Sequence, residues 1–175
     1  MAHFSYRFTV PAPAAAVRDF HHDPSVLSRL SPPPIFVRLG EAEPLGDGSL
    51  ADLTMWFGPI PVRWQAVHSD VGPSGFTDEQ RRGPLRAWRH THRFIALDDD
   101  HTLVEERIAY EHQPGWRGWL TRLVFNRVGL TALFTYRQLV TRLALQRRSV
   151  PAWLPVGIAG VVAGAALLWR RQARR

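Results

Sequence analysis

The 175-residue sequence contains no cysteine and no lysine, and its acidic residues stop at Glu111. Without cysteine the chain can form no disulfide, no thiolate zinc site and no thiol nucleophile. All 22 basic side chains are arginine, and together with many alanines and prolines this composition is typical of a GC-rich bacterial gene. A hydrophobic content of 45% with 21% charged residues indicates a globular core rather than a disordered chain.

The charge is distributed unevenly along the chain. Residues 1–111 carry 11 arginines and 15 acidic residues, whereas residues 112–175 carry 11 arginines and no acidic residue. The net charge of +7 therefore belongs to the C-terminal third. Nucleic-acid binding calls for a basic face on the folded body, so we expect no nucleic-acid partner. Arginines beside an apolar segment are instead typical of an anionic membrane surface.

That apolar segment lies between Arg148 and Arg170, where 21 consecutive residues carry no charge. As a helix it would be about 31 Å long, which matches a bilayer hydrocarbon core of about 30 Å. Trp153 and Trp169 lie near its two ends, where amphipathic rings prefer the membrane interface. We therefore predict a soluble domain over residues 1–149, a transmembrane helix over 150–169 and a basic tail over 170–175.

The flanks of this span bear on its orientation and assembly. The first ten residues alternate polar and apolar types without a basic leader, so we expect no export signal. This places the N-terminal domain on the cytoplasmic side of a bacterial cytoplasmic membrane. Because both flanks are basic, a deeply embedded tail that does not span is the alternative.

Gly160 and Gly164 form a GxxxG step, a candidate homodimer contact unless glycine and alanine merely fill the apolar span.

Hydrophobic periodicity predicts the secondary structure of the soluble part. Alternation over residues 3–10 predicts a strand, and two short helices are expected over 14–22 and 24–30. Six further strand-like runs end at Gly-Pro, Gly-Asp or acidic turns: residues 35–43, 49–57, 60–71, 75–82, 85–97 and 102–112. Their short connections indicate an antiparallel meander. The proline-free stretch 118–148 predicts one long helix that Gly129 could bend, which gives the α+β order β-α-α-β-β-β-β-β-β-α.

This order, and the segment FTDEQRRGPLRAWRHTHRF at residues 76–94, resemble the START-like (SRPBCC or Bet v 1-like) superfamily. The resemblance covers residues 3–148 and excludes the tail. It is nearest to bacterial polyketide cyclase/dehydrase-like and coenzyme Q-binding-like proteins, which are sometimes joined to an epimerase-type domain. The resemblance implies a helix-grip fold, a curved antiparallel sheet around a long C-terminal helix, with a cavity for a hydrophobic ligand. It implies no particular reaction, because the superfamily includes carriers, sensors and enzymes.

Strand alternation also selects the side chains that face this cavity. We take the face that carries the aromatic residues as the inward one. The predicted ligand-binding set is then Phe76, Asp78, Gln80, Arg82, Arg86, Trp88, His90, His92, Phe94, Glu106 and Tyr110. In this set Arg82 and Arg86 flank the Gly83-Pro84 turn, so we expect them at one rim, where arginine can bind an anionic group.

Two carboxylates and two imidazoles in one interior require an explanation, since buried charges are costly unless paired. They could form a satisfied polar network, bind the polar end of a ligand, or transfer protons as general acid and base. A His-x-His pair such as His90 and His92 can also chelate zinc or iron. Because the spacing fixes no third ligand, we predict no metal and no cofactor, and we assign no catalytic residue.

Three functions are compatible with these features. The first is a membrane-tethered carrier or sensor for a hydrophobic small molecule such as a lipid, a quinone or a polyketide-like compound. The second is a cyclase or dehydratase-type enzyme that uses the cavity histidines and carboxylates, although the sequence contains no nucleophile motif, phosphate loop or dinucleotide fingerprint. The third is a membrane-associated interaction protein without a ligand.

Overall fold

The computed structural model of the protein describes residues 1–149. The predicted span over 150–169, its Gly160–Gly164 step and the basic tail over 170–175 lie outside these residues. Within residues 1–149, none of the helices combines the length and the apolar character needed to cross a membrane.

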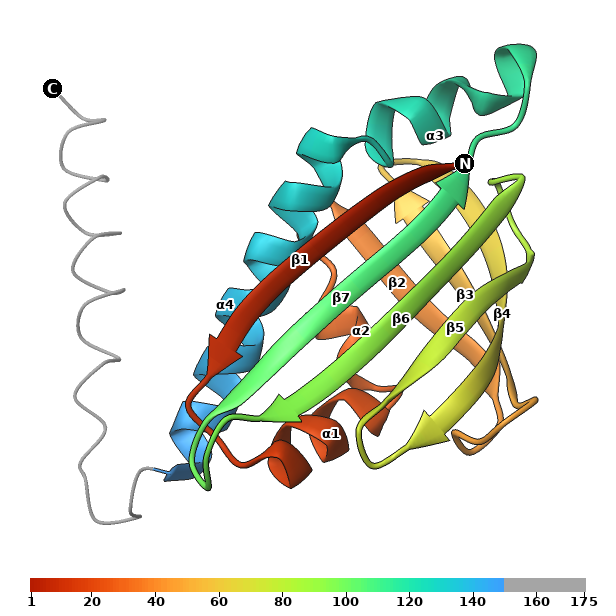
Figure 1. The fold of residues 1–175 in the computed structure, drawn as a ribbon. Coiled ribbons are helices and arrows are strands. Elements are labelled where there is room, and N and C mark those ends of the chain that lie inside the picture. The colour runs from red at the N-terminus through yellow and green to blue at the C-terminus, as the bar shows by residue number, and fades with distance from the viewer. Residues whose placement is uncertain (150–175) are drawn as a thin grey trace, which may run out of the picture.

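Seven strands form one antiparallel sheet in the order β1-β7-β6-β5-β4-β3-β2 (Figure 1). Consecutive strands from β2 to β7 are neighbours, as the short glycine-containing or acidic turns between them predict. The first strand returns to pair with the last, so β1 and β2 are the two edges of the sheet. The strands are β1 (Ala2–Val10), β2 (Ile35–Ala42), β3 (Leu50–Phe57), β4 (Ile60–Gly72), β5 (Gly75–Arg82), β6 (Ala87–Ala96) and β7 (Thr102–Glu111).

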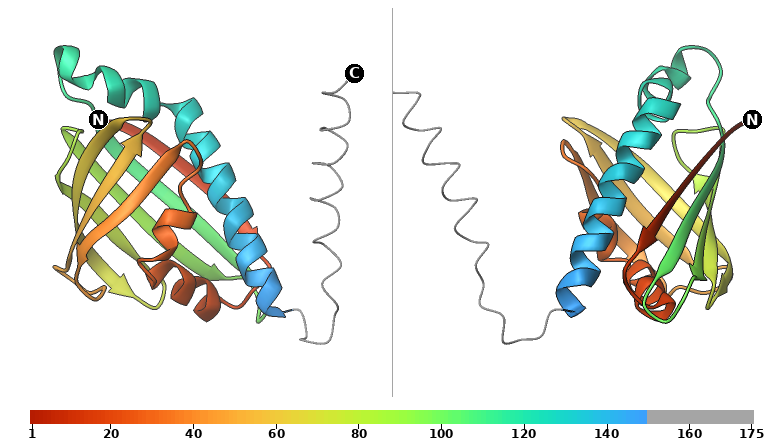
Figure 2. Two further views of the ribbon diagram at one scale, coloured as in Figure 1. Left: turned by 180° about the vertical axis from the view of Figure 1, so that it is seen from behind. Right: turned by 60° about the vertical axis from the view of Figure 1, so that its left-hand side comes forward.

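Helices cover the concave side of this sheet. Helices α1 (Ala14–His22) and α2 (Val26–Arg29) connect the two edge strands, with α1 at one end of the sheet and α2 over its concave side (Figure 1 and Figure 2). Helix α4 (Arg127–Ser149) runs along the concave side and contacts β1 (Figure 2). The predicted α+β helix-grip architecture is therefore confirmed for the described residues, and it leaves an interior between sheet and helices.

The single long helix predicted over 118–148 is wrong. The segment forms a 3-10 turn η1 (Gly115–Gly118), a short helix α3 (Trp119–Val124) and the separate helix α4. Asn126 explains the break, because its side-chain oxygen accepts the N–H of Gly129 at 3.0 Å as an N-cap, while its amide donates to the carbonyls of Arg122 and Leu123. The interruption thus precedes Gly129, the position at which we expected a bend.

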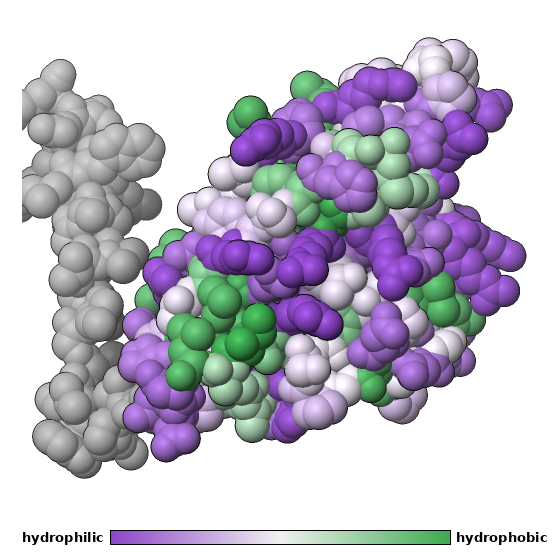
Figure 3. Space-filling view, in the orientation of Figure 1, coloured by the Kyte–Doolittle hydropathy of each residue, from purple (hydrophilic) through white to green (hydrophobic). Residues whose placement is uncertain are grey.

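The apolar interior consists of two clusters that share the inward face of the sheet. One cluster, around Phe8, Val17 and Phe94, packs α1 against β1 and β6, and the other, around Trp64, Trp88 and Phe134, packs α4 against the central strands. The outer face of the sheet is mainly hydrophilic (Figure 3). One face of the sheet is therefore buried and the other solvated, as expected for an antiparallel sheet.

Candidate functional site

An internal cavity of about 400 Å³ lies between the sheet and the helices. Its walls are mostly apolar and come from α2, the inward faces of β2 to β4, and α4. Examples are Leu30, Val37, Leu53, Met55 and Leu133. Sites for small organic molecules have this character, with apolar walls and a few fixed polar groups.

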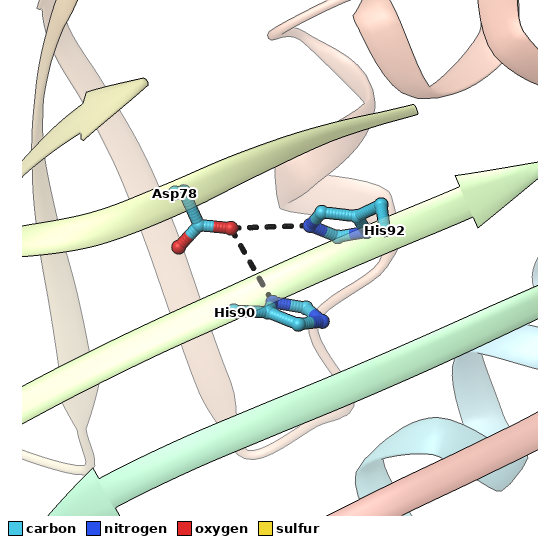
Figure 4. Close-up of side chains that lie close together, drawn as sticks. All are labelled: Asp78, His90 and His92. Carbon is cyan, nitrogen blue, oxygen red and sulfur yellow. Dashed lines mark hydrogen bonds and ion pairs between the residues drawn. The ribbon is translucent and has the colours of Figure 1, made fainter. Parts of the chain in front are cut away.

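The polar groups of the cavity wall gather where β5, β6 and β7 lie side by side. Asp78 lies opposite His90 in the β5–β6 register, and His92 lies opposite Glu106 in the β6–β7 register. One carboxylate oxygen of Asp78, Oδ2, lies 3.1 Å from Nε2 of His92 and 3.4 Å from Nδ1 of His90 (Figure 4). The sheet register therefore brings the predicted imidazoles and carboxylates together in one cluster.

Glu106 approaches the same two rings from the other side. Its Oε2 lies 2.8 Å from Nε2 of His90, in hydrogen-bond geometry, and 2.9 Å from Nδ1 of His92. The second contact is ionic rather than a directed hydrogen bond, and Nδ1 of His92 has no hydrogen-bond partner among the described residues. Each imidazole is thus held between two carboxylates, and Glu106 is only 2% exposed.

The charges of the cluster stabilise one another. Burial alone would raise the pKa of Glu106, but the imidazoles of His92 and His90 hold it well below its usual range. Burial would also raise the pKa of Asp78, and the same two imidazoles lower it. For His92, burial lowers the pKa, but the carboxylates of Glu106 and Asp78 outweigh this effect and raise it to about 9. The cluster therefore holds an imidazolium between two carboxylates at neutral pH.

Sequence reasoning missed two cationic or titratable neighbours of this cluster. Arg137 of α4 lines the cavity with its guanidinium 5.2 Å from the ring of Phe134, and it interacts electrostatically with Glu106 and Asp78. Its Nε donates to the carbonyl of Leu30 at 3.3 Å. Among 22 arginines, no sequence signal marks this one as inward.

Helix α1 supplies the other missed neighbour, His21, which also lines the cavity. Its Nδ1 lies 2.8 Å from the carbonyl of Val17, and its ring lies 6.4 Å from that of His92. Burial lowers the pKa of His21 to about 4, against the opposing attraction of Glu106. His21 is therefore neutral at physiological pH.

Arg82 and Arg86 do not belong to the cavity wall, which corrects the rim prediction. The β4–β5 register passes from the pair Gln65–Arg82 to the pair Ala66–Gln80, so β5 carries one extra residue there. This bulge turns Arg82 to the outer face of the sheet, where it lines a surface groove with Gln65. Arg86 precedes β6 and forms an exposed ion pair with Glu111 at 3.0 Å.

The other predicted residues are divided between the cavity and the packed core. Phe76, Trp88, Phe94 and Tyr110 all belong to the two core clusters, but of these four Phe76 and Trp88 also line the cavity with the polar cluster. Gln80 uses its side-chain amide to bind both the N–H and the carbonyl of Leu85, which closes the β5–β6 hairpin. Contact with a ligand stays a prediction for Phe76, Trp88 and the polar cluster.

Two chemical capacities follow from this arrangement. Imidazoles fixed by carboxylates can donate hydrogen bonds to a polar ligand end or transfer protons near neutral pH. The donor atoms of Asp78, His90 and His92 also lie within 4.8 Å of one another, which is close enough to share a metal ion. The carboxylate beside the two imidazoles, which the sequence spacing could not identify, is thus that of Asp78 on the neighbouring strand.

We expect the free energy of unfolding of the metal-free protein to fall as the pH rises above about 6.5. His92, which faces Asp78, Glu106, His90 and His21, has a pKa raised from 6.5 to about 9 in the folded state. Its contribution is therefore complete below pH 6.5 and is lost as the pH rises through 9, on the order of 3 kcal/mol. Urea unfolding in EDTA from pH 6 to 10 measures this loss.

The loss of stability at acid pH has a different origin, the buried imidazole of His21. His21, which faces Glu106, His92 and Arg137, binds its proton at about pH 4 in the folded chain instead of 6.5. Stability therefore falls as the pH falls from 6.5 to 4, and protonation of Asp78 and Glu106 continues the loss below that. In a plot of stability against pH, His21→Gln should reduce the fall on the acid side, and His92→Gln should reduce the fall on the alkaline side. An unchanged pH dependence in both variants would contradict the assignment.

The chain matches no protein-family model and no curated protein sequence, but its fold matches many solved structures. The Zhui aromatase/cyclase from Streptomyces sp. R1128 superposes with a TM-score of 0.67 at 16% identity, over 87% of this chain and 98% of that chain. Norcoclaurine synthase from Thalictrum flavum, in complex with dopamine and hydroxybenzaldehyde, superposes with a TM-score of 0.60 at 16% identity, over 83% of this chain and 87% of that chain.

A third similar structure is a nucleoside-diphosphate sugar epimerase from Corynebacterium glutamicum. It has 25% identity and a TM-score of 0.59, over 82% of this chain and 29% of the longer epimerase chain. Residues 1–149 thus have the START-like helix-grip fold, as the sequence resemblance implies. At these identities the comparisons establish the fold and leave the function to the site.

Proposed function

We propose that the protein binds a hydrophobic small molecule inside the sheet–helix cavity, with the polar end of the ligand at the imidazole–carboxylate cluster. The single observation that carries this proposal is the cavity itself, about 400 Å³ with mostly apolar walls and one polar corner. A void of this size costs the folded protein packing energy when nothing fills it. A lipid, a quinone or a polyketide-like compound has the matching chemistry, with an apolar body and a few oxygens.

The direct test is to identify what the purified full-length protein carries. We expect an organic extract, examined by mass spectrometry, to contain one class of apolar compound at close to one molecule per chain. Protein treated identically after denaturation serves as the control for carry-over. An empty native protein that also fails to bind a fluorescent fatty acid would contradict the proposal.

A cyclase or dehydratase-type activity is the second candidate, and the geometry of His90 favours it. This imidazole lies in the cavity wall with Nε2 hydrogen-bonded to Glu106 at 2.8 Å, whereas Nδ1 makes only an ionic contact with Asp78 at 3.4 Å and is the nitrogen that could exchange a proton with a substrate. A histidine oriented by a carboxylate is the usual arrangement for proton transfer to or from a bound substrate. His90→Gln should then abolish turnover of a bound polyketide-like substrate while its dissociation constant changes little. Parallel loss of binding would favour the carrier.

We further propose that residues 150–169 tether the domain to the cytoplasmic face of a bacterial membrane. The uncharged run between flanking arginines supports it. A second support is the exposed apolar surface of η1 and α3, where Trp116, Trp119 and Leu123 are 78%, 56% and 67% exposed, with Arg117 and Arg122 in the same segment. Tryptophan and arginine on one short segment suit an anionic membrane interface.

Fractionation tests the tether separately from ligand binding. We expect the full chain to require detergent for extraction and a chain ending at residue 149 to be soluble, because only the former contains the apolar run. Release of the full chain by high salt alone would replace the spanning tether with a peripheral contact.

A further inference from the structure

Three side chains on two neighbouring strands converge on one point of the cavity wall. Asp78 belongs to β5, and His90 and His92 belong to β6 (Figure 4). Oδ2 of Asp78 lies 3.1 Å from Nε2 of His92 and 3.4 Å from Nδ1 of His90, and the three atoms lie within 4.8 Å of one another. The alternation of β6 and the β5–β6 register together fix this set.

These separations suit a common metal ion. Bonds of about 2.0–2.2 Å from zinc to imidazole nitrogen and carboxylate oxygen place two ligands of a tetrahedral site about 3.4 Å apart. The two distances to Asp78 already have this magnitude. The third separation, between Nδ1 of His90 and Nε2 of His92, is within 4.8 Å, so rotation of the side chains would have to bring these two nitrogens closer for all three atoms to bind one cation.

Glu106 provides the outer support that metal-binding imidazoles usually have. It contacts Nε2 of His90 and Nδ1 of His92, which in each ring is the nitrogen opposite to the one that faces Asp78. A buried carboxylate behind a histidine fixes the ring orientation and raises its basicity as a ligand. Here a single carboxylate supports both imidazoles.

A divalent ion at Asp78, His90 and His92 would compete with the proton of the His92 imidazolium, because a metal binds the unprotonated ring. Because all three residues line the cavity, the remaining coordination position faces the space where a ligand binds.

We propose that Asp78, His90 and His92 form a binding site for a divalent transition metal ion, with Glu106 as the outer support and one coordination position open to the cavity. Imidazole and carboxylate ligands with an open position are suited to zinc or iron rather than to calcium or magnesium. The metal would contact the polar end of whatever the cavity holds. This site goes beyond the proposed binding function, which does not require it.

The test uses the full chain purified without a histidine tag, treated with EDTA and then titrated with Co²⁺. We expect one equivalent to bind and to give visible absorption bands of a protein-bound ion, and Zn²⁺ to remove them. Asp78→Asn and His90→Gln should weaken Co²⁺ binding at least 100-fold, whereas Glu106→Gln should weaken it about 10–100-fold, the usual effect of losing an outer partner. Circular dichroism of each variant establishes that it is folded.

His101→Gln is the matched control, because His101 and Asp98 form an exposed imidazole–carboxylate pair with 2.9 Å between Nδ1 and Oδ1. It should leave the cobalt bands unchanged. Folded wild-type protein without bands at millimolar Co²⁺, or bands that persist in both Asp78→Asn and His90→Gln, would overturn the metal site. Binding of the fluorescent fatty acid, measured in EDTA, reports on the proposed cavity function independently of the metal.

Discussion

Glu106→Ala is expected to lower the free energy of unfolding by about 3–5 kcal/mol, the usual cost of removing one partner of a buried ion pair. The side chain is 2% exposed and faces the imidazoles of His90 and His92. Its removal leaves the His92 imidazolium and the Arg137 guanidinium with only Asp78 as a counter-charge. Urea denaturation at pH 6.5 in EDTA measures the change.

The neighbouring glutamate supplies a matched control. Glu105 is 3% exposed, but it lies on the opposite face of β7, where it forms ion pairs with the exposed side chains of Arg7 and Arg107. Because solvent screens such pairs, Glu105→Ala should cost about 1 kcal/mol or less. Equal losses for the two alanine variants would show that the cluster at Glu106 contributes nothing beyond an ordinary surface ion pair.

Ala66→Phe is expected to weaken binding of a fluorescent fatty acid at least tenfold. Ala66 is buried in the cavity wall on β4, and an added phenyl ring would occupy space that the apolar body of the ligand needs. The free energy of unfolding should fall by no more than about 1–3 kcal/mol, the range typical of added core volume, because the ring enters a cavity. A fluorescence titration and a thermal unfolding curve separate the two effects.

Val67→Phe is the control for this substitution. Val67 follows Ala66 on the same strand, and alternation directs its side chain to the other face of the sheet, away from the cavity. The affinity of the Val67→Phe variant for the fatty acid should equal that of the wild type. Similar affinities for Ala66→Phe and the wild type, with both proteins folded, would mean that the fatty acid binds elsewhere.

The fold was largely predictable because local signals and long-range pairing agree. Glycine- and proline-containing turns bound the runs 60–71 and 75–82, and the structure has strands over Ile60–Gly72 and Gly75–Arg82. Alternation likewise placed His90, His92 and Glu106 on the inward face. The strict period of two that sets the strand faces is a local property of the backbone, so it can be read without the partner strand.

Features that depend on a partner element could not be read in this way. The bulge that turns Arg82 outward exists only in the register between β4 and β5. The break at Asn126 follows from a capping side chain within a run that otherwise has helical character. Arg137 and His21 reach the cluster only because α4 and α1 pack over it, and nothing in their local sequence distinguishes them.

A crystal structure of the full chain with its co-purified ligand would show whether a hydrophobic molecule occupies the cavity with its polar end at the cluster. We expect continuous electron density along Leu53 and Met55 that ends within hydrogen-bond or metal-bond distance of Asp78 or His90. A cavity filled by ordered water, or a ligand whose polar end points away from these side chains, would contradict it.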